Sequence, residues 1–91
     1  MKARHLFIAG RVHGVGFRDW LLQEARAHQL QGWVRNRTDG RVEVVLAGEE
    51  AAIEAVLLLC RRGPPLAQVT EILESFCELP EEPDFIRRPT L

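Results

Sequence analysis

The amino-acid sequence predicts an α+β sandwich, in which an antiparallel sheet of four strands carries two helices on one face. Three observations favour this fold class. Short apolar or alternating stretches, bounded by glycine, proline or Asp-Gly, are typical of strands. Two longer stretches repeat apolar residues at helical spacing. The elements follow the order strand, helix, strand, strand, helix, strand, and right-handed crossovers then place both helices on the same side, as in the ferredoxin-like fold.

The first half of the chain is predicted to form two strands and a helix. Residues 5–9 are a short apolar run that predicts a buried strand. Residues 19–30 are rich in helix-forming side chains, and Asp19 in the first turn suits the positive end of the helix dipole. Residues 32–37 predict the second strand, and the Asp-Gly turn within residues 38–40 predicts a hairpin to the third.

The second half is predicted to contain the other helix and the remaining strands. Residues 41–47 alternate apolar and other side chains, which predicts the third strand. Residues 49–60 predict a helix that residues 63–65, Gly-Pro-Pro, bring to an end. Residues 69–76 predict the fourth strand, and residues 84–88 are a candidate for a short last strand.

The composition is that of an ordinary globular protein, with 46% hydrophobic residues, 27% charged residues and a net charge of −1. Proteins that bind nucleic acid or membranes usually carry a basic excess, so we expect neither partner. Cys60 and Cys77 lie in apolar surroundings without metal-ligand spacing, which predicts reduced core thiols and no metal site. No apolar run reaches the length of a signal peptide core or a membrane span. We expect one cytoplasmic domain over residues 1–91, acting as a monomer.

A glycine-rich loop at residues 10–18 joins the first strand to the first helix and is the main candidate for a functional site. Its three glycines let backbone N–H groups turn toward one point, and the helix N-terminus adds partial positive charge. Arg18 contributes a planar cation with several donors. The combination favours a tetrahedral oxyanion such as phosphate. A plain glycine-rich turn followed by a surface arginine explains the loop equally well at this stage.

The side chains available limit the chemistry of such a loop. It lacks the Gly-Lys-Ser/Thr ending of a nucleotide P-loop and a cysteine nucleophile, and His13 is more typical of a residue that orders a loop. No acidic cluster suits Mg²⁺. This leaves a phosphoryl group on a leaving group that needs no protonation, such as a carboxylate. Asn36 could hold the attacking water, although an asparagine there is also typical of a turn. Arg35, Arg37 and Arg41 are expected to be exposed charges that attract an anion.

Two stretches of the sequence resemble the signatures of the acylphosphatase family. Residues 8–18 (IAGRVHGVGFR) are similar to G-x-V-Q-G-V-x-F-R. Residues 32–42 (GWVRNRTDGRV), with Gly48 beyond them, are similar to G-W-V-x-N-x-x-x-G-x-V followed by a later glycine. The likeness continues through residues 62–65 and 85–88, so it covers nearly the whole chain. The resemblance implies the ferredoxin-like fold and hydrolysis of acyl phosphates to a carboxylate and inorganic phosphate. It also implies direct in-line attack by water, with no covalent intermediate, metal or cofactor.

The resemblance also implies roles for individual residues. Arg18 matches the arginine that binds the phosphate, and Asn36 matches the asparagine that orients the water, so both are predicted to be catalytic. The phosphate-binding cradle is predicted to comprise His13, Gly14, Val15, Gly16, Phe17 and Arg18. Two positions depart from the family pattern, since His13 replaces a glutamine and Gln29 replaces a glycine after the first helix. A positive φ at Gln29 would cost about 1 kcal/mol.

Two other functions stay open from the sequence. A non-catalytic module could use the same cradle to bind phosphate-like anions, and acylphosphatase-like modules also occur inside larger hydrogenase maturation proteins. An RNA-binding domain of this fold would need stacking aromatic residues on its central strands and a basic face. Phe7 is the lone aromatic residue of the first predicted strand, and the net charge is negative, so the sequence disfavours RNA binding.

Overall fold

The structure, a computed structural model, describes residues 3–91 and contains five strands and two helices in these residues. Each helix and strand expected from the sequence is present, with ends displaced by a few residues. In chain order the elements are β1 (Ala3–Arg11), α1 (Phe17–Ala27), β2 (Gln31–Asn36), β3 (Val42–Ala47), α2 (Glu50–Arg62), β4 (Gln68–Cys77) and β5 (Phe85–Arg87).

The sheet has five strands in the order β4-β1-β3-β2-β5. The pairs β1–β3, β1–β4 and β2–β3 are antiparallel, whereas β5 is parallel to β2. The expectation of a four-stranded antiparallel sheet is therefore wrong in the strand count and in the direction of one pair. The physical reason is that Phe85 is fully buried beside β2. Burial of this side chain draws the short end of the chain onto the sheet edge, and three residues are too few to show that pairing as a sequence pattern.

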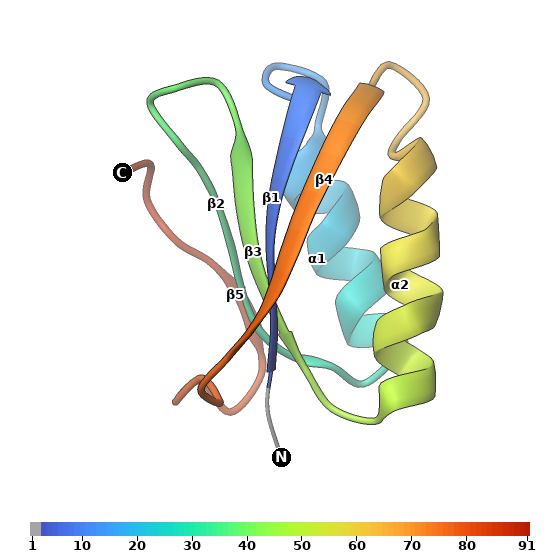
Figure 1. The fold of residues 1–91 in the computed structure, drawn as a ribbon, viewed down its shortest axis with the longest axis vertical. Helices are drawn as coiled ribbons and strands as arrows, with labels where there is room; N and C mark the ends of the chain where they lie inside the picture. Colours follow the sequence, from blue (N-terminus) through green and yellow to red (C-terminus); the bar gives the residue numbers. More distant parts are fainter. Residues whose placement is uncertain (1–2) are drawn as a thin grey trace.

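Both helices cover the same face of the sheet, and the core lies between the two layers (Figure 1). Alternate residues of β1 point into this core, so Leu6 and Ile8 are fully buried. The helices contribute the stripes that their periodicity predicts, including Leu21 from α1 and Ile53 from α2. The opposite face of the sheet carries no helix and displays polar and aromatic side chains. The expected two-layer arrangement is confirmed.

The two cysteines are free thiols in different surroundings. Cys60 is buried in the core between sheet and helices, and this burial raises the pKa of its thiol to about 12. Cys77 is half-buried on the helix-free face, so the expectation of a core thiol holds for Cys60 alone. Neither α1 nor α2, the helices of residues 3–91, has the length and apolar character needed to span a bilayer.

At the end of α1 the backbone adopts a conformation that is unusual for a glutamine. Gln29 has φ of 59°, in the left-handed region where glycine is favoured. The amide of the next residue, Leu30, donates to the carbonyl of Ala25 at 2.9 Å, so the chain turns sharply out of the helix. The positive φ expected at this position is confirmed, and Gln29 carries the local strain.

The sheet topology brings three chain segments to the same end of the molecule. The loop after β1, the first turn of α1 and the β2–β3 hairpin lie together at the top of Figure 1. The edge strand β5 runs beside β2 toward this end, and the amide of Leu91 donates to the carbonyl of Asn36 at 3.2 Å. The glycine loop, the end of β2 and the C-terminal strand therefore border one region.

Candidate active site

The loop between β1 and α1 has the backbone conformation that its glycines permit. Gly14 and Gly16 have φ of 70° and 78°, and Gly16 is the residue that precedes the first turn of α1. A Cβ at either position would meet no atom within 4 Å. The glycines are therefore required by the left-handed backbone and not by crowding. This conformation turns the loop back over the helix N-terminus.

The amide groups of this loop and of the first two helical residues are free to bind a ligand. Within residues 3–91, none of the N–H groups of residues 13–18 donates a hydrogen bond to a backbone carbonyl or a side chain. No side chain caps the N-terminus of α1 either. Unpaired N–H groups at a helix N-terminus carry partial positive charge and bind anions.

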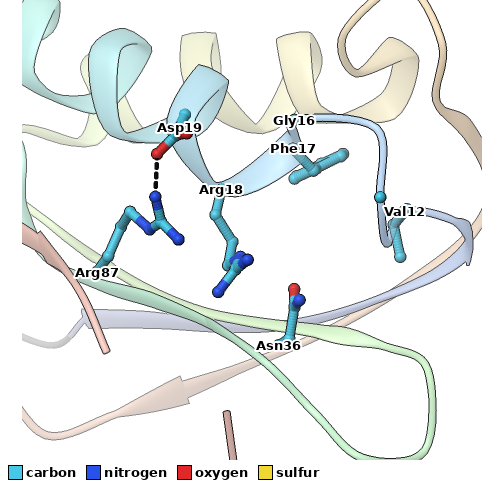
Figure 2. A pocket seen from close by; sticks show the side chains of 8 residues that line it. Val12, Gly16, Phe17, Arg18, Asp19, Asn36 and Arg87 are labelled. Carbon is cyan, nitrogen blue, oxygen red and sulfur yellow. Dashed lines mark hydrogen bonds and ion pairs between the residues drawn. The ribbon is translucent and has the colours of Figure 1, made fainter. Parts of the chain in front are cut away.

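A small cavity of about 80 Å³ opens between this loop, the end of β2 and β5 (Figure 2). Its walls combine glycine backbone, apolar side chains, two arginines, one carboxylate and one amide. The lining residues are Val12, Gly14, Gly16, Phe17, Arg18, Asp19, Asn36 and Arg87.

Arg18 and Asn36 bring the principal polar groups of the cavity together. Arg18 belongs to the first turn of α1, and its side chain extends toward Asn36 (Figure 2). Asn36 is the last residue of β2 and lies on the same face as the buried Val34, as the alternation of the strand predicts. Its side-chain oxygen Oδ1 is buried and has no hydrogen-bond partner among the described residues. An unpaired buried polar atom costs about 1–3 kcal/mol, so this oxygen is suited to a water or a ligand.

The structure brings most of the predicted site residues to one place. Gly14, Gly16, Phe17, Arg18 and Asn36 all line the cavity. Two predicted cradle residues have side chains elsewhere. His13 Nε2 lies 2.9 Å from the backbone oxygen of Arg41 in the β2–β3 hairpin, and Val15 packs against the hydrophobic core. These two residues could therefore contribute to a cradle through their backbone amides.

Sequence reasoning missed two charged residues that line the cavity, Asp19 and Arg87. Nη1 of Arg87 donates to Oδ1 of Asp19 (Figure 2). The sequence places Asp19 next to Arg18 and in the first turn of α1, where its charge suits the helix dipole, but this pattern alone does not predict that Asp19 lines the cavity. Arg87 belongs to residues 85–88, where the sequence resembles the family, but local patterns do not give the position of this last strand in the sheet.

The arginines of the hairpin are half-buried and engaged with carboxylates instead of being exposed as expected. Nε of Arg35 donates to Oε1 of Glu43 at 2.8 Å, and Nη1 of Arg37 donates to the same atom at 3.3 Å. Arg41 pairs with Asp39 at 2.8 Å. These three arginines share two carboxylates, Glu43 and Asp39, and none of them lines the cavity, whose arginines are Arg18 and Arg87.

Glu43 on the helix-free face is almost fully buried, with a side chain 7% exposed. Burial opposes its ionisation, but hydrogen bonds from His5 and Arg35 outweigh that effect and hold the pKa of Glu43 below its usual value of 4.5. Nε2 of His5 lies 2.7 Å from Oε2 of Glu43. This cluster fastens β1, β2 and β3 to one another on the side away from the cavity.

Three separate comparisons with known proteins identify the same family. The acylphosphatase family model matches residues 4–86. An acylphosphatase of Acidiphilium cryptum is 57% identical over 90 residues, which span 99% of each chain. The crystal structure of an acylphosphatase from Bacillus subtilis superposes with a TM-score of 0.91 at 36% identity, covering 97% of this chain and 99% of that one. Full-length HypF, in its phosphate- and nucleotide-bound form, matches with a TM-score of 0.89 at 33% identity. The match covers 98% of this chain but only 12% of HypF.

The fold and the cavity define an α/β sandwich with a pocket at one end that is lined by glycine backbone, Arg18, Asn36 and Arg87. With the family match over most of its length, this chain belongs to the acylphosphatase family. The histidine, cysteine, aspartate and glutamate side chains of residues 3–91 form no group of three or more that could hold a metal ion.

Proposed function

We propose that this protein hydrolyses the carboxyl–phosphate bond of acyl phosphates, releasing a carboxylate and inorganic phosphate. One observation carries the proposal. Arg18, two glycines of the loop and Asn36 line one cavity, and among the described residues neither the loop amides nor the buried oxygen of Asn36 has a hydrogen-bond partner. Family membership supports the same activity.

The phosphoryl group is held by the loop and by Arg18. The backbone N–H groups of residues 13–18, which donate no hydrogen bond within residues 3–91, donate to the equatorial oxygens. Arg18 adds a charged fork that can donate two hydrogen bonds to those oxygens. Both elements are in place before substrate arrives, so they stabilise the spread negative charge of the transition state without reorganising.

Asn36 orients the attacking water. A water in the cavity donates one O–H to Oδ1 of Asn36, which satisfies the buried oxygen and directs a lone pair of the water at phosphorus. A new bond forms between the water oxygen and phosphorus while the bond to the acyl oxygen breaks. The electron pair leaves with the carboxylate, and the water protons pass to phosphate and solvent.

The leaving group needs no general acid, because a carboxylate is stable as an anion near neutral pH. Among the residues that line the cavity, Asp19 is the one nucleophilic side chain, and it is paired with Arg87. We therefore propose direct attack by water with no covalent intermediate. Acid quenching during turnover of ³²P-labelled substrate should recover no phosphorylated protein, and a labelled protein band would contradict direct attack.

The reaction should be measured with benzoyl phosphate in the presence of EDTA. We expect hydrolysis at the same rate with and without the chelator, because the residues of the cavity supply all the groups that the reaction uses. Phosphate binding measured by calorimetry, together with no turnover, would instead identify a binding module. We propose that the protein is cytoplasmic, which its two free thiols favour, and that it acts as a monomer.

A further inference from the structure

We propose that Arg87 determines specificity by favouring acyl phosphates whose acyl group carries a second negative charge, such as a carboxylate. The inference rests on the proposed function and assigns a role to a residue of the same cavity. Arg87 lines the cavity together with Arg18 and Asn36. Hydrolysis by the loop, Arg18 and Asn36 requires no second guanidinium, so this cation is available for another part of the substrate.

The backbone of Arg87 is held firmly, which fixes where its side chain begins. Arg87 pairs with Val34 of β2, and the amide of Arg88 donates to the carbonyl of Val34 at 2.9 Å. Phe85 anchors the strand in the core with no exposed surface. Nε of Arg26 in α1 also donates to the carbonyl of Phe85 at 3.0 Å. The edge strand β5 is therefore attached both to the sheet and to the helix that begins at the site.

The contact with Asp19 shows that Arg87 accommodates a carboxylate at the rim of the cavity. Nη1 of Arg87 binds Asp19, whose side chain is 67% exposed, while that of Arg87 is 39% exposed. Within residues 3–91, Nε and Nη2 of Arg87 have no hydrogen-bond partner. An exposed ion pair contributes about 0–1 kcal/mol, so the contact with Asp19 is weak. Asp19 orients the guanidinium but leaves two of its nitrogen atoms without a partner among the described residues. A carboxylate of the substrate can bind the remaining donors.

The position of Arg87 suits the acyl part of the substrate better than the phosphoryl group. In Figure 2 the side chain of Arg18 lies between Arg87 and the segment from Val12 to Gly16. A phosphoryl group held by the loop amides and Arg18 leaves its acyl group to extend out of the cradle, where the rim carries Arg87. A second negative charge on that acyl group is attracted to the guanidinium of Arg87, whereas a neutral acyl group gains no such attraction.

The test compares benzoyl phosphate with 3-carboxybenzoyl phosphate, which share a ring and differ by one carboxylate. The measured quantity is the ratio of kcat/KM for the carboxylated substrate to kcat/KM for benzoyl phosphate. Any difference in intrinsic reactivity cancels when variants are compared with the unaltered protein. We expect Arg87→Gln to lower this ratio by about fivefold, since an ion pair of this exposure is worth about 1 kcal/mol. We expect Arg87→Lys to retain part of the preference. Asp19→Asn should raise the ratio, because it removes the carboxylate that competes for the same guanidinium.

Arg26→Gln is the matched control. It removes another contact between α1 and β5, the hydrogen bond from Arg26 to Phe85, and Arg26 does not line the cavity. It should leave the ratio unchanged. The inference is overturned if Arg87→Gln leaves the ratio unchanged and alters only the thermal midpoint, which would make the pair with Asp19 a structural tie. An equal fall for both substrates overturns it too, because Arg87 would then act on the phosphoryl group. If the unaltered protein hydrolyses neither substrate, the proposed function itself fails, which is a distinct result.

Discussion

Arg18 and Asn36 face one cavity from opposite layers of the fold, with Arg18 on the first turn of α1 and Asn36 at the end of β2. The guanidinium supplies charge and donors, and the amide supplies a buried oxygen without a partner among the described residues. A phosphoryl group would accept hydrogen bonds from the guanidinium of Arg18, and a water bound next to it would donate one to the amide oxygen of Asn36. In the proposed mechanism, phosphate binding is therefore assigned to the helix side of the cavity and orientation of the water to the sheet side.

Replacement of Arg18 by glutamine should remove most of the activity. The variant keeps a polar side chain of similar length but loses the charge that stabilises the phosphoryl oxygens in the transition state. Loss of one such donor lowers kcat by about 10²–10³-fold. Steady-state kinetics with benzoyl phosphate measures the effect, with Arg26→Gln in the last turn of the same helix as a control. Activity within twofold of the unaltered protein would rule out the role given to Arg18.

Replacement of Gln29 by glycine should stabilise the protein. The residue has φ of 59°, where a side chain is strained and glycine is not. We expect the free energy of unfolding to rise by about 0.5–1 kcal/mol, less the entropy that glycine adds to the unfolded chain. Urea denaturation measures this free energy of unfolding. The activity should not change, because Gln29 is outside the cavity. A destabilised variant would show that the side chain of Gln29 contributes more than its backbone strain costs.

Replacement of Glu43 by glutamine should destabilise the protein in a pH-dependent way. The folded state lowers the pKa of this carboxyl from 4.5, so ionised Glu43 stabilises the fold fully above that value. The contribution is lost as the pH falls through the lower pKa of the folded state. At pH 7 we expect a loss of about 2 kcal/mol, which is typical of a buried hydrogen bond to charged partners.

Denaturation at several pH values distinguishes this effect from a simple packing defect. The difference in stability between the unaltered protein and Glu43→Gln should shrink as the pH is lowered below 4.5. Replacement of Glu78, an exposed carboxylate outside the cluster, serves as a comparison. A difference that stays constant down to pH 3 would contradict the role of the ionised carboxylate.

His13 should act through the hairpin and not through chemistry on the substrate. Its Nε2 meets the carbonyl oxygen of Arg41, in the turn that follows Asn36. Glutamine, the residue usual in the family, can keep this hydrogen bond, whereas alanine cannot. We expect His13→Gln to retain activity and His13→Ala to lose about fivefold in kcat/KM, as the loss of about 1 kcal/mol of hydrogen bonding implies. If His13→Gln and His13→Ala are equally impaired, the ring has a function that this contact does not explain.

The sequence predicted the parts of the molecule that obey local rules. Alternation placed Val34 in the core and hence Asn36 on the same face, and the glycine spacing placed a loop before α1. The position of Arg87 follows from a parallel edge pairing of three residues, which has no periodicity of its own. The engagement of Arg35 and Arg37 depends on Glu43, which local patterns do not connect to them. The features that the sequence could not predict are therefore those that depend on contacts between residues far apart in the chain.

The most direct test of the proposed site is the kinetics of Asn36→Ala combined with phosphate binding by calorimetry. In the proposed mechanism the loop and Arg18 bind the phosphoryl group and Asn36 orients the water, so loss of Asn36 should affect kcat and phosphate binding differently. We expect kcat to fall by about 100-fold or more, as loss of a positioned reactant implies. The dissociation constant for inorganic phosphate should stay within about threefold, a shift of less than 1 kcal/mol. A variant with the kcat of the unaltered protein would contradict the account.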